Sequence, residues 1–142
     1  MIILFLTIIT LYQHGYALAA TPKVVVNNSA VVFDVAPFIK EDRVMVPMRA
    51  IFEALGAEVE WNPENKSVTA RSGSDIVFLV IGSRTAFRYM SGVDSGMVSV
   101  ELDAPPDIVN DRTVVPVRFV SESLNATVNW SSRDQTVYIT KN

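Results

Sequence analysis

The chain has 142 residues, of which 49% are apolar and 19% are charged, and this balance excludes an intrinsically disordered protein because it supplies enough apolar surface for a core. The formal net charge of -3, with no basic stripe, gives no electrostatic reason to expect nucleic acid as a partner. There is no cysteine, which excludes both a disulfide framework and a thiol nucleophile.

Residues 1–19 are expected to be a signal peptide. The apolar run at residues 1–11 is too short to cross a bilayer, which takes roughly 20 residues. Ala17 and Ala19 supply the small side chains that signal peptidase requires, although no Lys or Arg precedes the apolar run. The only histidine is His14, so cleavage after Ala19 would leave a chain without the commonest general base and transition-metal ligand.

The remainder, residues 20–142, is expected to be one domain made of two copies of one unit. Aligning Arg43 with Arg112, an offset of 69 residues, brings the two halves into register without a gap. Similarity at a fixed offset is the signature of an internal repeat, and the units are predicted to span about residues 23–71 and 76–140. Identical pairs at this offset are Arg43/Arg112, Val46/Val115, Pro47/Pro116, Arg49/Arg118, Glu53/Glu122, Leu55/Leu124, Ala57/Ala126, Val59/Val128, Trp61/Trp130 and Val68/Val137.

Each unit is predicted to contain one short helix after a β-prone run. Pro47 restricts Val46 to extended backbone and suits the first turn of a helix. Apolar residues then recur with helical spacing, and Gly56 can end the helix in the left-handed conformation. In the second unit Pro116 opens the helix and Asn125 ends it. The apolar positions are Met48, Ile51, Phe52 and Leu55 in the first helix and Val117, Val120 and Leu124 in the second.

A β-hairpin is expected after each helix, because apolar and polar residues alternate there with the period of a half-buried strand. The predicted fold is therefore α+β, with two pseudo-symmetric helix–hairpin units packed through a mainly antiparallel sheet. Strands are expected at residues 57–61, 66–71, 76–81 and 85–89, with an opening hairpin at 24–35 and a second hairpin at 126–139 around a turn at 131–134.

The runs VPMRAIFEALGAEVEWNPENKSV and VPVRFVSESLNATVNWSSRDQTVYI resemble the copper amine oxidase N-terminal-like domain family. The resemblance covers residues 24–139 and rests on the doubled pattern V-P-x-R, E-x-L and V-x-W. The family is common in exported proteins of Gram-positive bacteria, where similar domains accompany cell-wall hydrolases and surface proteins. The resemblance therefore implies a secreted or wall-associated accessory module.

The resemblance implies neither copper nor oxidase activity, and no cofactor is expected. Catalysis in the amine oxidases belongs to a separate large domain with a tyrosine-derived quinone and three histidine copper ligands. The chain departs from the family pattern at the turn before each V-P-x-R. The family favours Asn-Gly there, whereas this chain has Glu41-Asp42 and Asn110-Asp111, so the type of turn is in question.

Glu53 and Glu122 are the residues that could carry catalysis. Brought together by the repeat, they would form the pair of carboxylates that glycoside hydrolysis requires. The alternative is an i,i+4 ion pair on each helix, Arg49 with Glu53 and Arg118 with Glu122. Duplication copies structural residues, whereas a catalytic acid and base need different environments, so the ion pairs are favoured. No catalytic, cofactor-binding or metal-ligating residue is therefore assigned.

Trp61 and Trp130 are open to two interpretations. Exposed, they would offer platforms for the apolar faces of sugars. On the inward strand faces beside Val59 and Val128 they would be core residues, which is favoured because Trp is highly buried on average. The positions expected to define the repeat structurally are Pro47, Arg49, Glu53, Leu55, Trp61, Pro116, Arg118, Glu122, Leu124 and Trp130.

The favoured function is a non-catalytic exported module that binds cell-wall polymer or another envelope protein. One alternative is a small secreted glycan hydrolase that uses Glu53 and Glu122. A third is a structural stalk that dimerises through exposed strand edges, so a homo-oligomer stays open. Neither a nucleic-acid partner nor a membrane span after signal cleavage is expected.

Overall fold

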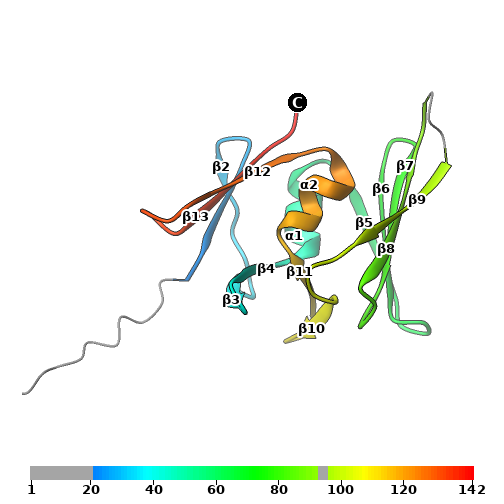
Figure 1. Cartoon of the computed structure of the whole chain (residues 1–142), viewed down its shortest axis with the longest axis horizontal. Coiled ribbons are helices and arrows are strands. Elements are labelled where there is room, and N and C mark those ends of the chain that lie inside the picture. Colours follow the sequence, from blue (N-terminus) through cyan, green and yellow to red (C-terminus); the bar gives the residue numbers. More distant parts are fainter. Residues whose placement is uncertain (1–20, 93–95) are drawn as a thin grey trace, which may run out of the picture.

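The computed structural model describes residues 21–92 and 96–142, and the predicted signal peptide lies outside the described residues. This part of the chain consists mainly of strands, with two seven-residue helices near its centre, α1 (Met48–Ala54) and α2 (Arg118–Leu124) (Figure 1). None of its helices is long and apolar enough to cross a membrane. The strands are β1 (Lys23–Val26), β2 (Ser29–Ala30), β3 (Phe38–Lys40), β4 (Arg43–Pro47), β5 (Glu58–Asn62), β6 (Ser67–Ser72), β7 (Asp75–Val80), β8 (Thr85–Met90), β9 (Gly96–Glu101), β10 (Asp107–Val109), β11 (Arg112–Pro116), β12 (Thr127–Ser131) and β13 (Thr136–Thr140).

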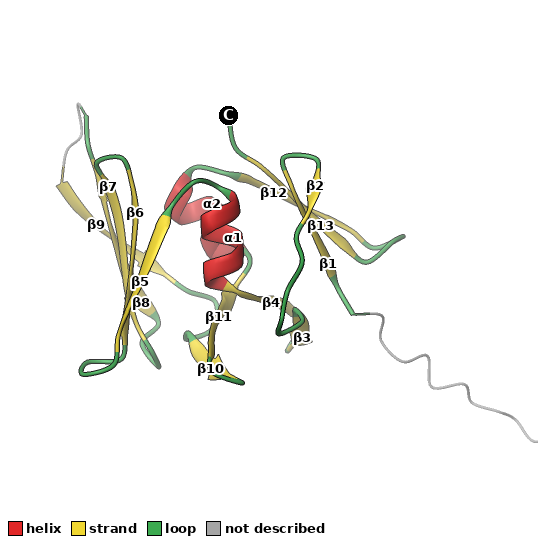
Figure 2. Ribbon diagram, turned by 180° about the vertical axis from the view of Figure 1, so that it is seen from behind, coloured by secondary structure: helices red, strands yellow, loops and turns green. Residues whose placement is uncertain are grey.

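The strands form three sheets around the helices. The middle sheet has the order β10-β11-β4-β3 and is antiparallel throughout. A five-stranded antiparallel sheet runs in chain order from β5 to β9, and a four-stranded sheet has the order β12-β13-β1-β2, with β1 parallel to β13. Figure 2 shows the two helices between these outer sheets, with β4 and β11 leading into them. The helices are therefore flanked by strands on both sides.

A hydrophobic cluster joins both helices to all three sheets. Val46 and Val115 contribute from the middle sheet, and Phe52 and Phe119 from the helices. The rings of Phe52 and Phe119 stack with their centroids 6.2 Å apart, an arrangement that adds to the gain from burying their area. Members from the outer sheets include Val24, Val68, Leu79, Val137 and Ile139.

The expected α+β class is wrong, because the described residues are mostly in strands. The two helix–hairpin units also do not pack as equal halves. The hairpin β5–β6 is extended by β7, β8 and β9, whereas β12–β13 takes β1 as its neighbour. A lone two-stranded hairpin is marginally stable, so each needs further strands, and the two hairpins find theirs in different parts of the chain. The sequence did not reveal β3, β9 and β10.

The short-range signals of the sequence are borne out at the helix ends. Helix α1 begins directly after Pro47, and Gly56 has a φ of +87° after it. Helix α2 begins at Arg118, one residue later than a start after Pro116, and Asn125 ends it with a φ of 54°. Both C-terminal residues therefore adopt the left-handed conformation that ends a helix.

The turns Glu41-Asp42 and Asn110-Asp111 keep the geometry that Asn-Gly would give. Their φ values are 50° and 61° in the first turn and 46° and 62° in the second. Two positive φ angles in a two-residue hairpin loop are typical of a type I′ turn, whose twist matches that of the flanking strands. The departure from the family pattern therefore changes the residues and leaves the hairpins intact.

Candidate functional site

A first cleft, of about 590 Å³, opens between helix α1 and the hairpin β10–β11. Helix α1 and strand β5 supply one wall, and β10, β11 and the turn between them supply the other. The cleft therefore combines parts of both halves of the sequence. It is lined by Asp34, Pro47, Met48, Arg49, Ala50, Glu53, Val59, Trp61, Val68, Ile108, Asp111, Arg112 and Thr113.

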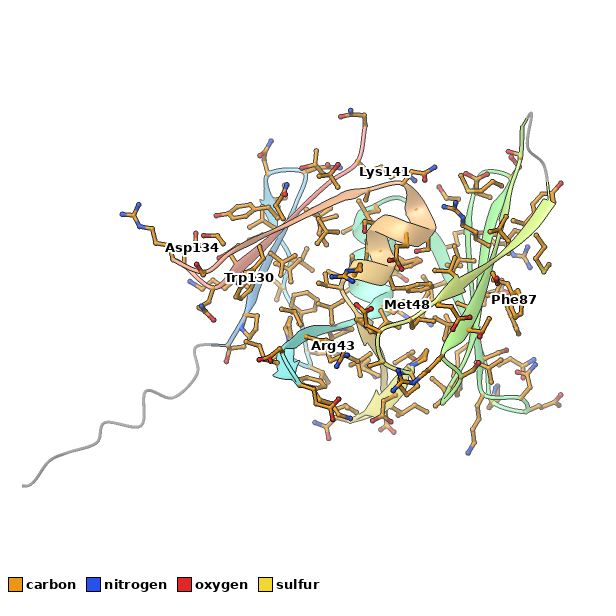
Figure 3. The ribbon with its side chains drawn as sticks, in the orientation of Figure 1. Arg43, Met48, Phe87, Trp130, Asp134 and Lys141 are labelled. Atoms are coloured by element: carbon orange, nitrogen blue, oxygen red, sulfur yellow. The ribbon has the colours of Figure 1, made fainter. Side chains whose placement is uncertain are left out.

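A second cleft, of about 720 Å³, opens between helix α2 and the hairpin β3–β4. Here α2 and β12 supply one wall, and the hairpin from the first half of the sequence supplies the other. Figure 3 shows two of its residues, Arg43 and Trp130, toward the same side of the molecule. The lining residues are Ile39, Asp42, Arg43, Val44, Asp103, Pro116, Val117, Arg118, Ser121, Glu122, Val128 and Trp130.

The two clefts are built from residues that correspond at the offset of 69 positions, which we call counterparts. Most of the residues that line one cleft have their counterpart among the residues that line the other. The corresponding pairs are Asp34/Asp103, Ile39/Ile108, Asp42/Asp111, Arg43/Arg112, Val44/Thr113, Pro47/Pro116, Met48/Val117, Arg49/Arg118, Glu53/Glu122, Val59/Val128 and Trp61/Trp130.

Both tryptophans lie in the clefts, and the expectation that they are core residues is wrong. Trp61 is 39% exposed and Trp130 is 43% exposed. The predicted strand face was right, because Val59 and Val128, two residues earlier, pack against the core. Each tryptophan is paired with a buried core residue, Val68 or Val137, and is itself partly exposed in a cleft.

In the first cleft two arginines are held by carboxylates. The Nη1 of Arg49 donates to Glu53 Oε1 at 3.3 Å and to the carbonyl of Val59 at 2.8 Å, which ties helix α1 to strand β5. Arg112 donates to the carboxylate of Asp34 through Nε at 2.9 Å and through Nη2. This partner lowers the pKa of Asp34 and raises the pKa of Arg112. Both arginines and the exposed Trp61 line this cleft.

The second cleft has the same residue types in a different pairing. The Nη1 of Arg118 lies 3.4 Å from Oδ2 of Asp103, and the Nη1 of Arg43 lies 3.4 Å from Oε2 of Glu41. The pKa of Glu122 is raised, first by partial burial and then by the negative charge of Asp103, against the opposing effect of Arg118. At Glu122, burial and the charge of Asp103 together therefore outweigh the attraction of Arg118.

The structure places Glu53 and Glu122 in different clefts, so it does not bring them together as a catalytic pair. The predicted ion pair between Arg49 and Glu53 is present. In the part of the chain that the structure describes, Arg118 pairs with Asp103 rather than with Glu122, so the second predicted pair is wrong.

The remaining repeat-defining positions serve the packing around the clefts. Pro47 and Pro116 are buried where β4 and β11 meet the helices. Leu124 is 5% exposed, whereas Leu55 is only partly buried. Leu55 and Leu124 line neither cleft, whereas Pro47 and Pro116 contribute a buried part of the lining where strand and helix meet.

The sequence pattern of the family described as the copper amine oxidase N-terminal domain matches residues 25–139. The chain belongs to this family. The resemblance seen in the sequence is thereby confirmed, and the copper amine oxidase N-terminal domain is a non-catalytic, accessory type of domain.

A protein of Brevibacillus choshinensis named "Protease inhibitor" is similar to this chain. The two are 35% identical over 98 residues, which cover 68% of this chain and 28% of that protein. The chain thus spans under a third of the relative's length.

The copper in the family's name does not fit the residues of this chain. Copper prefers imidazole or sulfur ligands, and the sequence has one histidine, His14, and no cysteine. Among residues 21–92 and 96–142, no group of three or more His, Asp or Glu side chains is arranged to hold a metal ion.

Sequence reasoning missed the walls that the hairpins contribute. Ile39 and Ile108 are 44% and 41% exposed at the rims of the clefts, and Asp34 and Asp103 form ion pairs inside them. A signal was present, because each of these pairs is identical at the 69-residue offset. Exposed, charged or apolar residues that recur at the offset outside the helix–hairpin unit are candidates for a shared surface.

Proposed function

We propose that this copper amine oxidase N-terminal domain is an exported, non-catalytic binding module of the bacterial cell envelope that holds cell-wall polymer in its two clefts. One observation carries the proposal: each cleft presents a half-exposed tryptophan beside arginine and carboxylate side chains. The chemistry of such a cleft is that of recognition, and the family supports an accessory role.

The side chains of the clefts suit a carbohydrate. An exposed indole offers a flat apolar face with a polar N–H, and the apolar face of a sugar ring can stack on it. Arg49 and Arg112 can donate to sugar oxygens in the first cleft, and carboxylates can accept from hydroxyl groups. Pockets of this type bind through one apolar platform and a few placed polar groups.

The arrangement does not favour hydrolysis of the polymer. A glycosidase places its two carboxylates about 5–10 Å apart across one bond, and Glu53 and Glu122 belong to different clefts. Within the first cleft, the carboxylate of Glu53 accepts a hydrogen bond from Arg49 and is ion-paired with it. We therefore propose binding without turnover.

Co-sedimentation with purified Gram-positive cell wall tests the proposal. The chain should pellet with the wall, and the double variant Trp61→Ala/Trp130→Ala should stay in the supernatant. Phe87→Ala is the matched control, because Phe87 is 38% exposed and lines neither cleft (Figure 3). Equal pelleting of all three proteins would place the binding surface elsewhere. No pelleting, with capture of one envelope protein or a concentration-dependent dimer, would overturn the proposal in favour of a protein partner or a stalk.

A second candidate is inhibition of a protease, which the name of the Brevibacillus choshinensis relative suggests. An inhibitor is also a binding module without turnover. The chain covers 28% of that protein, so the inhibitory part can belong to the remainder of the relative. Assays of this chain against secreted serine, cysteine and metallo-proteases decide it: inhibition at stoichiometric concentration would support this candidate, and full protease activity would exclude it for the classes tested.

A further inference from the structure

We infer that the module is bivalent: each chain binds two strands of a neutral, N-acetylated or hydroxyl-rich glycan, one in each cleft. The inference rests on the proposed function and goes beyond it, because it names the class of sugar and the number of sites. Its basis is the correspondence of the two clefts residue by residue.

The two clefts are related by an approximate local twofold axis. Val46 of β4 faces Val115 of β11 in the antiparallel ladder, and these residues are counterparts. An antiparallel pair whose counterparts face each other has a local twofold axis between them. Rotation about this axis carries α1 toward α2 and the hairpin β10–β11 toward β3–β4. A ligand in either cleft therefore meets counterpart residues, which are identical except at Val44/Thr113 and Met48/Val117.

The second step is that both clefts can be filled at once. They share no lining residue, and each takes its helix and tryptophan from one half of the sequence and its hairpin from the other. The first cleft thus combines Trp61 with Arg112, and the second combines Trp130 with Arg43. Neither site depends on the tryptophan of the other, so removing one tryptophan should leave the second site intact.

The third step concerns charge. The first cleft contains two arginines and three carboxylates, those of Asp34, Glu53 and Asp111. The second cleft contains two arginines and three carboxylates, those of Asp42, Asp103 and Glu122. A slight excess of negative charge disfavours polyanions such as phosphate-linked polymers. Mixed donors and acceptors around an indole favour an uncharged chain of hydroxyl and amide groups.

Calorimetric titration with tetra-N-acetylchitotetraose, a soluble neutral chain of N-acetylglucosamine, tests the inference. The wild-type chain and the control Phe87→Ala should each bind two molecules. Trp61→Ala and Trp130→Ala should each bind one, because loss of the stacking platform weakens its own cleft by at least about tenfold. Circular dichroism checks that each variant is folded. Binding of one molecule by the wild type would overturn the bivalency and leave the proposed function standing.

Two further readouts separate the remaining outcomes. With two sites, the wild type should cross-link fragments of purified wall into aggregates. Each single-tryptophan variant should pellet with the fragments without cross-linking them. Cross-linking by both Trp61→Ala and Trp130→Ala would overturn the assignment of the sites. Titration with a soluble glycerol phosphate polymer should give no signal; tighter binding of this polyanion than of the neutral sugar would overturn the ligand class. Failure of every chain to pellet with wall would instead overturn the proposed function itself.

Discussion

Val46 on β4 is paired with Val115 on β11, and both side chains are fully buried. The offset of 69 residues exchanges the two flanking pairs, Pro47 with Val114 and Met45 with Pro116, because it relates Pro47 to Pro116 and Met45 to Val114. The two halves of the sequence therefore meet at the centre of the middle sheet through equivalent positions. From this seam β4 leads into α1 and β11 leads into α2, and one cleft lies beside each helix.

This pairing predicts equal and shared consequences for mutation. Val46→Ala and Val115→Ala should each lower the free energy of unfolding by about 1–3 kcal/mol, because each leaves a cavity at the same seam. Both should shift one cooperative transition, as expected if residues 20–142 form one domain. Chemical denaturation followed by Trp fluorescence and by far-UV circular dichroism measures this. Two non-coincident transitions would instead indicate two tandem units.

The leucines at the helix ends should differ, although they are counterparts. Leu124 is 5% exposed, whereas Leu55 is only partly buried. Leu124→Ala should lower the free energy of unfolding by about 2–5 kcal/mol, and Leu55→Ala by clearly less, because less area leaves the core. The midpoints of thermal unfolding compare the two directly. An equal or larger effect at Leu55 would contradict the packing described here.

The local structure could be predicted from the sequence because local signals specify it. Pro47 and Gly56 bracket helix α1, and the helical spacing of Met48, Ile51 and Phe52 identifies its buried face. The sheets could not be predicted in this way. That β1 pairs in parallel with β13 depends on contacts across more than a hundred residues, to which no short pattern refers.

The clefts were missed for a related reason. Alternation along β5 and β12 gives the face on which each tryptophan lies, but it does not say where the core ends along the strand. Trp61 is partly exposed in a cleft whose opposite wall comes from β10–β11, far away in the sequence. Burial at the end of a strand is a tertiary property, so an average tendency of Trp to be buried gave the wrong answer.

Export makes a prediction about the start of the secreted chain. Ala17 and Ala19 fit the small-residue pattern of signal peptidase, and cleavage after Ala19 should give a protein that begins at Ala20 or within a few residues of it. N-terminal sequencing or intact mass of protein from culture medium or wall fraction measures this. Ala19→Phe should block processing. Recovery of the uncleaved chain from membranes would contradict the prediction.

Copper should not bind this domain tightly despite the family's name. The sequence offers no cysteine and one histidine, His14, which lies in the predicted signal peptide. Titration of the secreted form with Cu²⁺ or Zn²⁺ should show only weak binding through carboxylates. A stoichiometric site at about micromolar affinity or tighter would show that ligands have been overlooked.

Glu122 makes the last prediction, which concerns pH. Its pKa is raised above 4.5, the ordinary value of a glutamate, chiefly by burial and then by Asp103. The folded state therefore holds this proton more tightly than the unfolded state does, so the contribution of Glu122 to stability is fully present below about pH 4.5 and is lost as pH rises through its raised pKa. Glu122→Gln removes the charge and should stabilise the chain at neutral pH by less than about 1 kcal/mol, because the group is largely solvated. Thermal midpoints at several pH values should show this gain vanish below pH 4.5.

Glu53→Gln is the matched control: Glu53 accepts from Arg49, so this variant should give no gain at neutral pH. A Glu122→Gln variant that is less stable than the wild type at neutral pH would contradict the description of the second cleft.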